Sequence, residues 1–351
     1  MRILSSRRIL AALVVVLALA LVAALAWIRQ VPRAITVTAG QFPEELVYVQ
    51  AKDGIIDGGA AFTPPKELAK PIAVIWIHGW GTNFYDPAYV MIGRDLAELG
   101  YTCIVGNTRM HDTGNVQWIG DKRIRGGGYW GVASEQVRDI AAWIDFAEAR
   151  GFKQVVLVGH SAGWAAVTQY QAEVQDDRVV GVVIASGQIH SFTGPTDSDQ
   201  IAQATRMMAD GHPDELVRDP KRSFPSYISA ATMMDIVNTP PEFKDFFGTR
   251  TETRNPAVTR IRVPLLAFFG TNEDVGGVAD LELLKSSLRR QSSGPSQVTT
   301  VMVKNADHMY TGEGRQVAQI IATWIAAFPR KRVGYPSARE VGSSDRQPDV
   351  R

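Results

Sequence analysis

The sequence predicts an α/β protein built on a mostly parallel, doubly wound sheet. Short apolar runs recur along the chain, as expected for strands that are buried on both faces. Segments with the apolar period of an amphipathic helix separate most of these runs, and that alternation is typical of parallel sheets covered by helices. The runs are Ile72–Ile77, Tyr101–Val105, Val155–Val158, Val179–Ile184 and Val263–Phe269.

Other elements flank this pattern. Leu46–Ala51 and Ala60–Thr63 have strand character and are separated by turn-forming residues, which suits an antiparallel sheet edge. Gln297–Val303 is the last strand candidate. Helices are expected at Ala88–Leu99, Ser134–Arg150, Gly163–Val174, Asp280–Arg289 and Glu313–Phe328.

The regular spacing breaks between Gly187 and Arg262. The intervening stretch, about 75 residues, is too long for a simple crossover between strands. We expect a mostly helical insertion, or lid, at about residues 188–260. It would lie over the carboxyl ends of the strands, where open parallel sheets bind their ligands.

The N-terminus has the features of a membrane anchor. Arg2, Arg7 and Arg8 precede an unbroken apolar run from Ile9 to Ile28. Its 20 residues would form a helix roughly 30 Å long, enough to span a bilayer. The excess of preceding arginines places the N-terminus in the cytoplasm and the remaining chain outside it. The alternative is a cleaved signal peptide ending near Ala26, which would leave a secreted protein.

These features divide the chain into four parts: an anchor at 1–29, a linker at 30–45, one large domain at 46–329 and a disordered tail at 330–351. Lys and Arg total 37 against 36 for Asp and Glu, so no strong field would attract nucleic acid. The single cysteine, Cys103, lies in an apolar run and offers neither an internal disulfide nor a thiolate metal cluster. No metal-binding or cofactor-binding motif is found, and no cofactor is expected.

The pentapeptide Gly159-His160-Ser161-Ala162-Gly163 stands between a predicted strand and a predicted helix. This is the setting of a nucleophile elbow, a sharp turn that exposes a serine hydroxyl at the top of a sheet. The flanking glycines let the turn close without side-chain clashes. Ser161 is therefore the candidate nucleophile.

A serine hydroxyl needs an imidazole base, and the base needs an acid to orient it. Of the six histidines, only His308 follows the last strand candidate, which matches the order Ser, acid, His. The acid should follow the preceding strand, where Glu273 and Asp274 stand side by side. We prefer Glu273 for its spacing from Gly270, and Asp274 remains the alternative.

A tetrahedral intermediate also requires two backbone amides directed at its oxyanion. One should be the amide of Ala162, directly after Ser161. The second should come from His78-Gly79-Trp80-Gly81, which follows the strand Ile72–Ile77. Trp80 is the preferred donor and Gly79 the alternative.

Together these motifs resemble those of the α/β-hydrolase superfamily, over about residues 46–328. The resemblance rests on the loop at His78, the pentapeptide at Ser161, the acid loop Gly270–Asp274 and the segment Ala306–His308. It implies the α/β-hydrolase fold. The usual acid of this fold is aspartate, so Glu273 departs from the pattern.

The resulting hypothesis is a serine hydrolase, most simply a carboxylesterase, that acts on a small acyl substrate. Cleavage of an amide or peptide bond and acyl transfer use the same catalytic groups and remain alternatives. A membrane-tethered binding protein that keeps the fold without catalysis is the alternative from another class. The sequence does not indicate an oligomeric state.

Overall fold

A computed structural model of the chain describes residues 14–17, 40–191, 197–218 and 227–328. Apart from residues 14–17, which are helical, the predicted anchor lies outside these ranges, as does the predicted tail at 330–351. No helix in the described ranges is both long enough and apolar enough to cross a bilayer. Residues 1–41 and 42–351 form separate compact units, and the fold below is that of the second unit.

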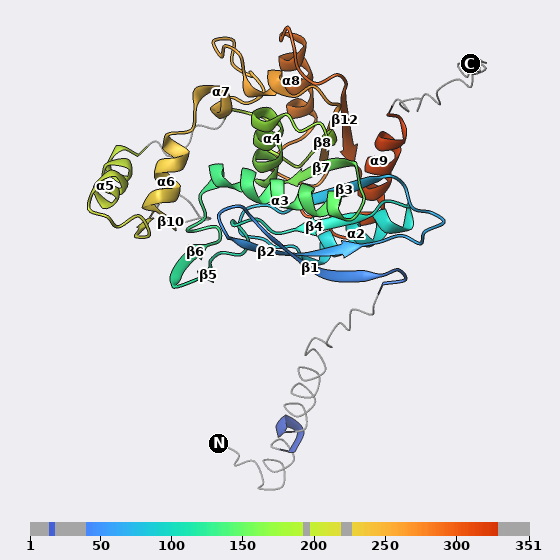
Figure 1. Cartoon of the computed structure of the whole chain (residues 1–351), viewed down its shortest axis with the longest axis horizontal. Helices are drawn as coiled ribbons and strands as arrows, with labels where there is room; N and C mark the ends of the chain where they lie inside the picture. The colour runs from blue at the N-terminus through green and yellow to red at the C-terminus, as the bar shows by residue number, and fades with distance from the viewer. Residues whose placement is uncertain (1–13, 18–39, 192–196, 219–226, 329–351) are drawn as a thin grey trace, which may run out of the picture. The chain divides into compact units, whose positions relative to one another are not determined.

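An eight-stranded sheet organises this unit, in the order β1-β2-β4-β3-β7-β8-β11-β12 (Figure 1). The first two strands and β4 pair antiparallel, whereas every neighbouring pair from β4 to β12 is parallel. The prediction of a mostly parallel sheet with an antiparallel edge is confirmed. The strands are β1 (Glu44–Gln50), β2 (Ile56–Phe62), β3 (Ile72–Ile77), β4 (Cys103–Gly106), β7 (Gln154–His160), β8 (Val179–Ala185), β11 (Leu265–Gly270) and β12 (Val298–Val303).

Helices cover both faces of the sheet. Residues of α2 (Pro87–Glu98) and α9 (Gly314–Ala326) pack on one face, together with Trp76 and Phe268. Residues of α3 (Gln136–Ala149) and α4 (Gly163–Val174) pack on the other. A further helix, α8 (Val278–Arg289), packs against β11. Because the central strands are buried on both faces, their sequences are almost entirely apolar.

The insertion between β8 and β11 is more mixed than the predicted helical lid. Its helical elements are α5 (Ser198–Ala209), α6 (Ala230–Val237), the short α7 (Pro241–Lys244) and a 3-10 turn, η2 (Ala257–Arg260). Two short strands, β9 (Leu216–Arg218) and β10 (Tyr227–Ser229), pair antiparallel and were not predicted.

A second unpredicted feature is the hairpin formed by β5 (Asn115–Ile119) and β6 (Lys122–Gly126), which lies at the same end of the domain as α5 and α6 (Figure 1). A 3-10 turn, η1 (Ala133–Glu135), then leads into α3.

A buried charge cluster fixes the loop that follows β4. The guanidinium of Arg109 lies 2.8 Å from the Asp139 carboxylate, 2.9 Å from that of Asp53 and 2.7 Å from that of Glu135. The backbone amide of Arg109 also donates to Asp139, at 2.9 Å. Fully buried charges are stable only when they are paired and hydrogen bonded, so this loop has little freedom to move.

Asp57, on β2, is fully buried beside this cluster. Neither of its carboxyl oxygens forms a hydrogen bond with any described residue. Burial, together with the nearby negative charge of Asp139, raises the pKa of Asp57 well above its usual range. The folded protein therefore holds a proton that the unfolded chain releases near pH 4.

This proton makes the stability depend on pH. Because the pKa of Asp57 is raised in the folded state, its contribution to the free energy of unfolding is full below about pH 4. As the pH rises, this contribution falls by about 1.4 kcal/mol for each pH unit up to the folded pKa. Asp57→Asn should therefore flatten the fall in unfolding free energy with rising pH, measured by urea denaturation. Asp177→Asn, at an exposed position, is the matched control. Identical slopes for wild type and Asp57→Asn would contradict the assignment.

Candidate active site

The chain turns sharply at Ser161, between the end of β7 and the start of α4. Ser161 has a φ of +49°, in the left-handed region that side chains other than glycine adopt at a cost of about 1–2 kcal/mol. Its backbone amide donates to the carbonyl oxygen of Ala185, at the end of the adjacent strand, at 2.8 Å. The turn thus places the serine side chain beyond the carboxyl end of the sheet.

Close backbone approaches explain the glycines around this turn. A Cβ at Gly159 would lie 2.6 Å from the Cα of Trp164, and one at Gly163 would meet the carbonyl oxygen of His78. A Cβ at Gly79 would lie 2.8 Å from the Cβ of Ser161. Moving the backbone to make room would be costly, so these positions exclude side chains. The loop after β3 can therefore pack directly on Ser161.

Two of the predicted residues, Glu273 and His308, contact each other. Nδ1 of His308 lies 2.8 Å from Oε2 of Glu273, whose side chain is fully buried. The other oxygen of Glu273 accepts hydrogen bonds from the Ser186 hydroxyl at 2.7 Å and from the Gly270 amide at 2.5 Å. Asp274 is exposed. Of the two carboxylates that the sequence left open, the structure places Glu273 against His308.

Tyr310 supports this carboxylate indirectly, through the hydroxyl of Ser186. The hydroxyl of Tyr310 lies 2.5 Å from that of Ser186, which itself donates to Glu273, so Tyr310 is the donor of this pair. Burial raises the pKa of Tyr310 well above its ordinary value and keeps the phenol protonated. Ser186 and Tyr310 both have left-handed backbone conformations, as Ser161 does. Two residues with strained backbones therefore help to hold the carboxylate of Glu273.

The amides predicted to bind an oxyanion differ in their availability. The backbone amides of Trp80 and Ala162 form no hydrogen bond with any described residue. That of Ala162 lies at the N-terminus of α4, where the helix dipole favours negative charge. The amide of Gly79, the alternative donor, instead donates to the Tyr89 hydroxyl at 3.3 Å. Trp80 and Ala162 are thus the donors left open for a ligand.

His78 shapes the loop that carries these donors. Its Nδ1 donates to the Gly79 carbonyl at 2.6 Å, and its Nε2 accepts from the Thr108 amide at 3.0 Å. Burial lowers the pKa of His78 to about 4, so the ring is neutral at physiological pH. This neutral ring joins the loop after β3 to the loop that Arg109 anchors.

His160 links the loops of the nucleophile and the base. Its Nε2 donates to the backbone carbonyl of His308 at 2.8 Å, and its Nδ1 accepts from the Tyr89 hydroxyl at 2.6 Å. Burial, and then the proximity of His308, lower the pKa of His160 to about 3. Because Tyr89 also receives the Gly79 amide, one hydrogen-bonded chain connects all three loops.

Ser161 and His308 share no direct hydrogen bond. His160 connects the two residues: it precedes Ser161 in the chain, and its ring centroid lies 4.8 Å from that of His308. Hydrogen bonds between a nucleophile and its base are often long in unliganded enzymes and tighten when substrate binds.

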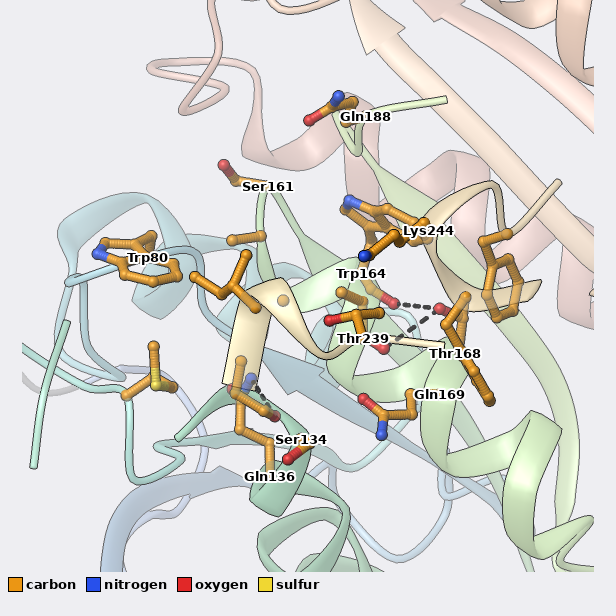
Figure 2. Close-up of a pocket in the computed structure, with 18 of the residues that line it drawn as sticks. Trp80, Ser134, Gln136, Ser161, Trp164, Thr168, Gln169, Gln188, Thr239 and Lys244 are labelled. Atoms are coloured by element: carbon orange, nitrogen blue, oxygen red, sulfur yellow. Dashed lines mark hydrogen bonds between the residues drawn. The ribbon is translucent and has the colours of Figure 1, made fainter. Parts of the chain in front are cut away.

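A cavity of about 620 Å³ opens beside Ser161. It runs between α4 and the segment from α6 to Phe247, and Figure 2 shows Ser161 and Gln188 on one side of it with Ser134 and Gln136 on the other. Aromatic side chains line it, namely Trp80, Trp164, Phe243, Phe246 and Phe247. Within the described ranges no three His, Cys, Asp or Glu side chains gather in a way that could hold a metal ion.

A family model described as the alpha/beta hydrolase family matches residues 74–320. The chain belongs to this family. The match includes all the residues discussed above around Ser161, Glu273 and His308, and it confirms the resemblance predicted from the sequence. No curated protein sequence matches the chain.

Solved structures with the same fold have low sequence identity to this chain. Est1E from Butyrivibrio proteoclasticus is 16% identical with a TM-score of 0.51, covering 80% of this chain and 97% of its own. The Pyrococcus furiosus esterase Pf2001 is 14% identical with a TM-score of 0.51, covering 84% and 98%. GrgF from Penicillium is 15% identical with a TM-score of 0.55, covering 81% and 97%.

Sequence reasoning missed several residues of this site. His160 lies inside the pentapeptide, just after the predicted apolar strand, which is a usable signal. Tyr89, Ser186 and Tyr310 are far from each other in the sequence and match no motif. Only the folded chain brings their hydroxyl groups to the imidazole and carboxylate that they serve.

The neighbouring carboxylates provide a matched test. Glu273→Gln keeps the size of the side chain but removes the charge that faces His308, so the rate at which a fluorophosphonate labels Ser161 should fall by about 10³-fold or more. Asp274→Asn should leave the rate within about twofold, because that side chain is exposed. Equal losses in the two variants, with melting temperatures unchanged, would contradict the assignment of Glu273.

Proposed function

We propose that the protein is a serine hydrolase that cleaves carboxylic esters through an acyl-enzyme. The contact between His308 and the buried Glu273 carries this proposal, because a carboxylate held by three donors is an orienting group for an imidazole base. Ser161, on its strained turn directly after His160, supplies the nucleophile.

Each group has one role in the reaction. The Ser161 hydroxyl attacks the acyl carbon while Nε2 of His308 takes its proton. Glu273 holds Nδ1–H of the imidazole and stabilises the imidazolium that forms. The amides of Trp80 and Ala162 bind the oxyanion, and each is worth about 3 kcal/mol of transition-state stabilisation.

The tetrahedral intermediate then collapses. The carbon–oxygen bond to the leaving alcohol breaks, and His308 returns its proton to that alcohol. A water molecule, deprotonated by the same imidazole, attacks the acyl-enzyme and releases the carboxylic acid. Ser161 recovers its proton, so the enzyme ends as it began.

The choice of an ester rests on the cavity and on similarity of fold. The aromatic walls suit an apolar acyl group. Solved structures of the same fold from Rhodothermus marinus and Pyrococcus furiosus are described as esterases. Amide cleavage and acyl transfer would use the same acyl-enzyme and differ in the leaving or accepting group.

A panel of p-nitrophenyl esters set against p-nitroanilides tests this function. We expect turnover of esters, loss of turnover by about 10⁴-fold or more in Ser161→Ala, and little cleavage of the anilides. Labelling by a fluorophosphonate, mapped to Ser161 by mass spectrometry, separates a poor substrate from an inert site. Folded protein without labelling would favour a binding role.

We also propose that the apolar run 9–28 anchors the protein in a membrane with the hydrolase domain outside the cytoplasm. In cells, the full chain should remain with membranes after alkaline carbonate extraction. Val15→Asp combined with Leu17→Asp should release it, because a charge at the centre of a span costs about 3 kcal/mol. Extraction of the unaltered chain by carbonate would contradict the anchor, and a mature terminus near Ala26 would instead indicate secretion.

A further inference from the structure

One cation faces the cavity without a carboxylate partner. Lys244, the last residue of α7, is half-buried and lines the cavity wall. Figure 2 shows its nitrogen near Trp164 and Thr239. The ammonium donates one hydrogen bond, to the carbonyl of Val237 at 2.8 Å. No carboxylate in the described ranges lies within 4.0 Å of it. An ammonium has three donors, so two remain for a ligand.

The residues after Lys244 hold it firmly in place. The buried carboxylate of Asp245 accepts the backbone amides of Thr249 and Arg250, each at 2.9 Å. Phe246 and Phe247 then pack on the indole of Trp164, with ring centroids 5.7 and 5.2 Å away. Because Trp164 belongs to the first turn of α4, the position of Lys244 is fixed relative to Ser161.

The other charged groups that line the cavity already have partners. Both oxygens of Asp235 accept hydrogen bonds from Ser134. Glu173 is exposed and accepts from Gln169 at 2.9 Å. Nε2 of His190 pairs with Asp280 at 2.8 Å. Lys244 is therefore the lining group whose positive charge has no ionic partner in the described ranges. An anion in the cavity would bind at its ammonium rather than beside Asp235 or Glu173, which keep their negative charges because their partners are neutral.

The cavity also indicates which part of an ester it holds. His308 protonates the leaving alcohol, so that group must lie on the His308 side of Ser161. His308 is not part of the cavity wall, which instead begins at Ser161 and Ala162 and continues along α4 past Trp164 to Thr168. This wall is therefore placed to receive the acyl group, with its aromatic rings against the carbon chain.

We propose that Lys244 forms an anion subsite for the acyl group, so that preferred substrates are half-esters of aliphatic dicarboxylic acids. One carboxyl group is esterified and reacts at Ser161, and the other is free and binds the ammonium of Lys244. The rings of Trp164, Phe246 and Phe247 contact the methylenes between them. This inference rests on the proposed esterase function.

The test compares p-nitrophenyl half-esters of adipic and suberic acid with the methyl ester of each, which is neutral and otherwise matched. Wild type should favour at least one free acid by about tenfold in KM, and this preference should shrink as NaCl is added. Lys244→Met should abolish the preference while leaving kcat/KM for the neutral esters within about twofold. Lys244→Arg should retain it.

Two controls separate the possible outcomes. Lys153→Met, at an exposed position, should leave the preference unchanged. Hydrolysis of the neutral esters by Ser161 with no preference for the free acids, or an equal preference in Lys244→Met, would overturn the subsite while leaving the esterase function intact. Absence of all ester turnover and of Ser161 labelling would overturn the esterase function itself. Calorimetry with monomethyl adipate in Ser161→Ala, which cannot hydrolyse it, then tests the subsite independently, since equal binding with and without Lys244→Met would refute it.

Discussion

The left-handed turn at Ser161 is the constraint on which the rest of the site depends. A non-glycine residue keeps such a conformation only if its surroundings allow no other, and here three glycines let backbone approach it from three sides. Gly159 brings the strand against the first turn of α4, Gly163 brings that helix against the loop after β3, and Gly79 brings the loop onto the serine itself. The same approach that strains Ser161 therefore positions the amides of Trp80 and Ala162 next to it.

Two neutral, buried histidines connect the Ser161 turn to the other loops of the site. Burial lowers the pKa values of His78 and His160 to about 4 and about 3, so neither ring titrates near physiological pH. Each instead uses one nitrogen as donor and the other as acceptor between loops that follow different strands. His308 differs because its side chain is partly exposed and faces a carboxylate. Two neutral rings thus lie beside the imidazole that we propose as the base.

The fold was largely predictable because parallel strands buried on both faces leave continuous apolar runs. The positions of Ser161 on a strand-to-helix turn and of His308 after the last strand were also predictable, since a glycine-flanked serine after a strand and a histidine after the last strand are local signals. The spacing from Gly270 favoured Glu273 over Asp274, but the sequence could not show that Ser186, far away in the chain, also donates to Glu273. The β5–β6 hairpin was not predicted because its strands are short and mix apolar residues with polar residues in β5 and with basic residues in β6.

The core sheet and the insertion contribute different groups to the site, and this difference affects substrate specificity. Every group proposed to act on the acyl carbon belongs to a loop at the carboxyl end of a core strand, whereas Lys244 and the rings of Phe246 and Phe247 belong to the insertion. The insertion reaches the catalytic region through Trp164, whose indole packs on both phenylalanines and whose backbone begins α4. Substitutions at Lys244 should therefore alter KM for particular acyl groups, because they change a wall of the cavity without moving the Ser161 turn. Phe247 has a second role, because its ring supports Trp164 in the first turn of α4, the helix that begins next to the amide of Ala162.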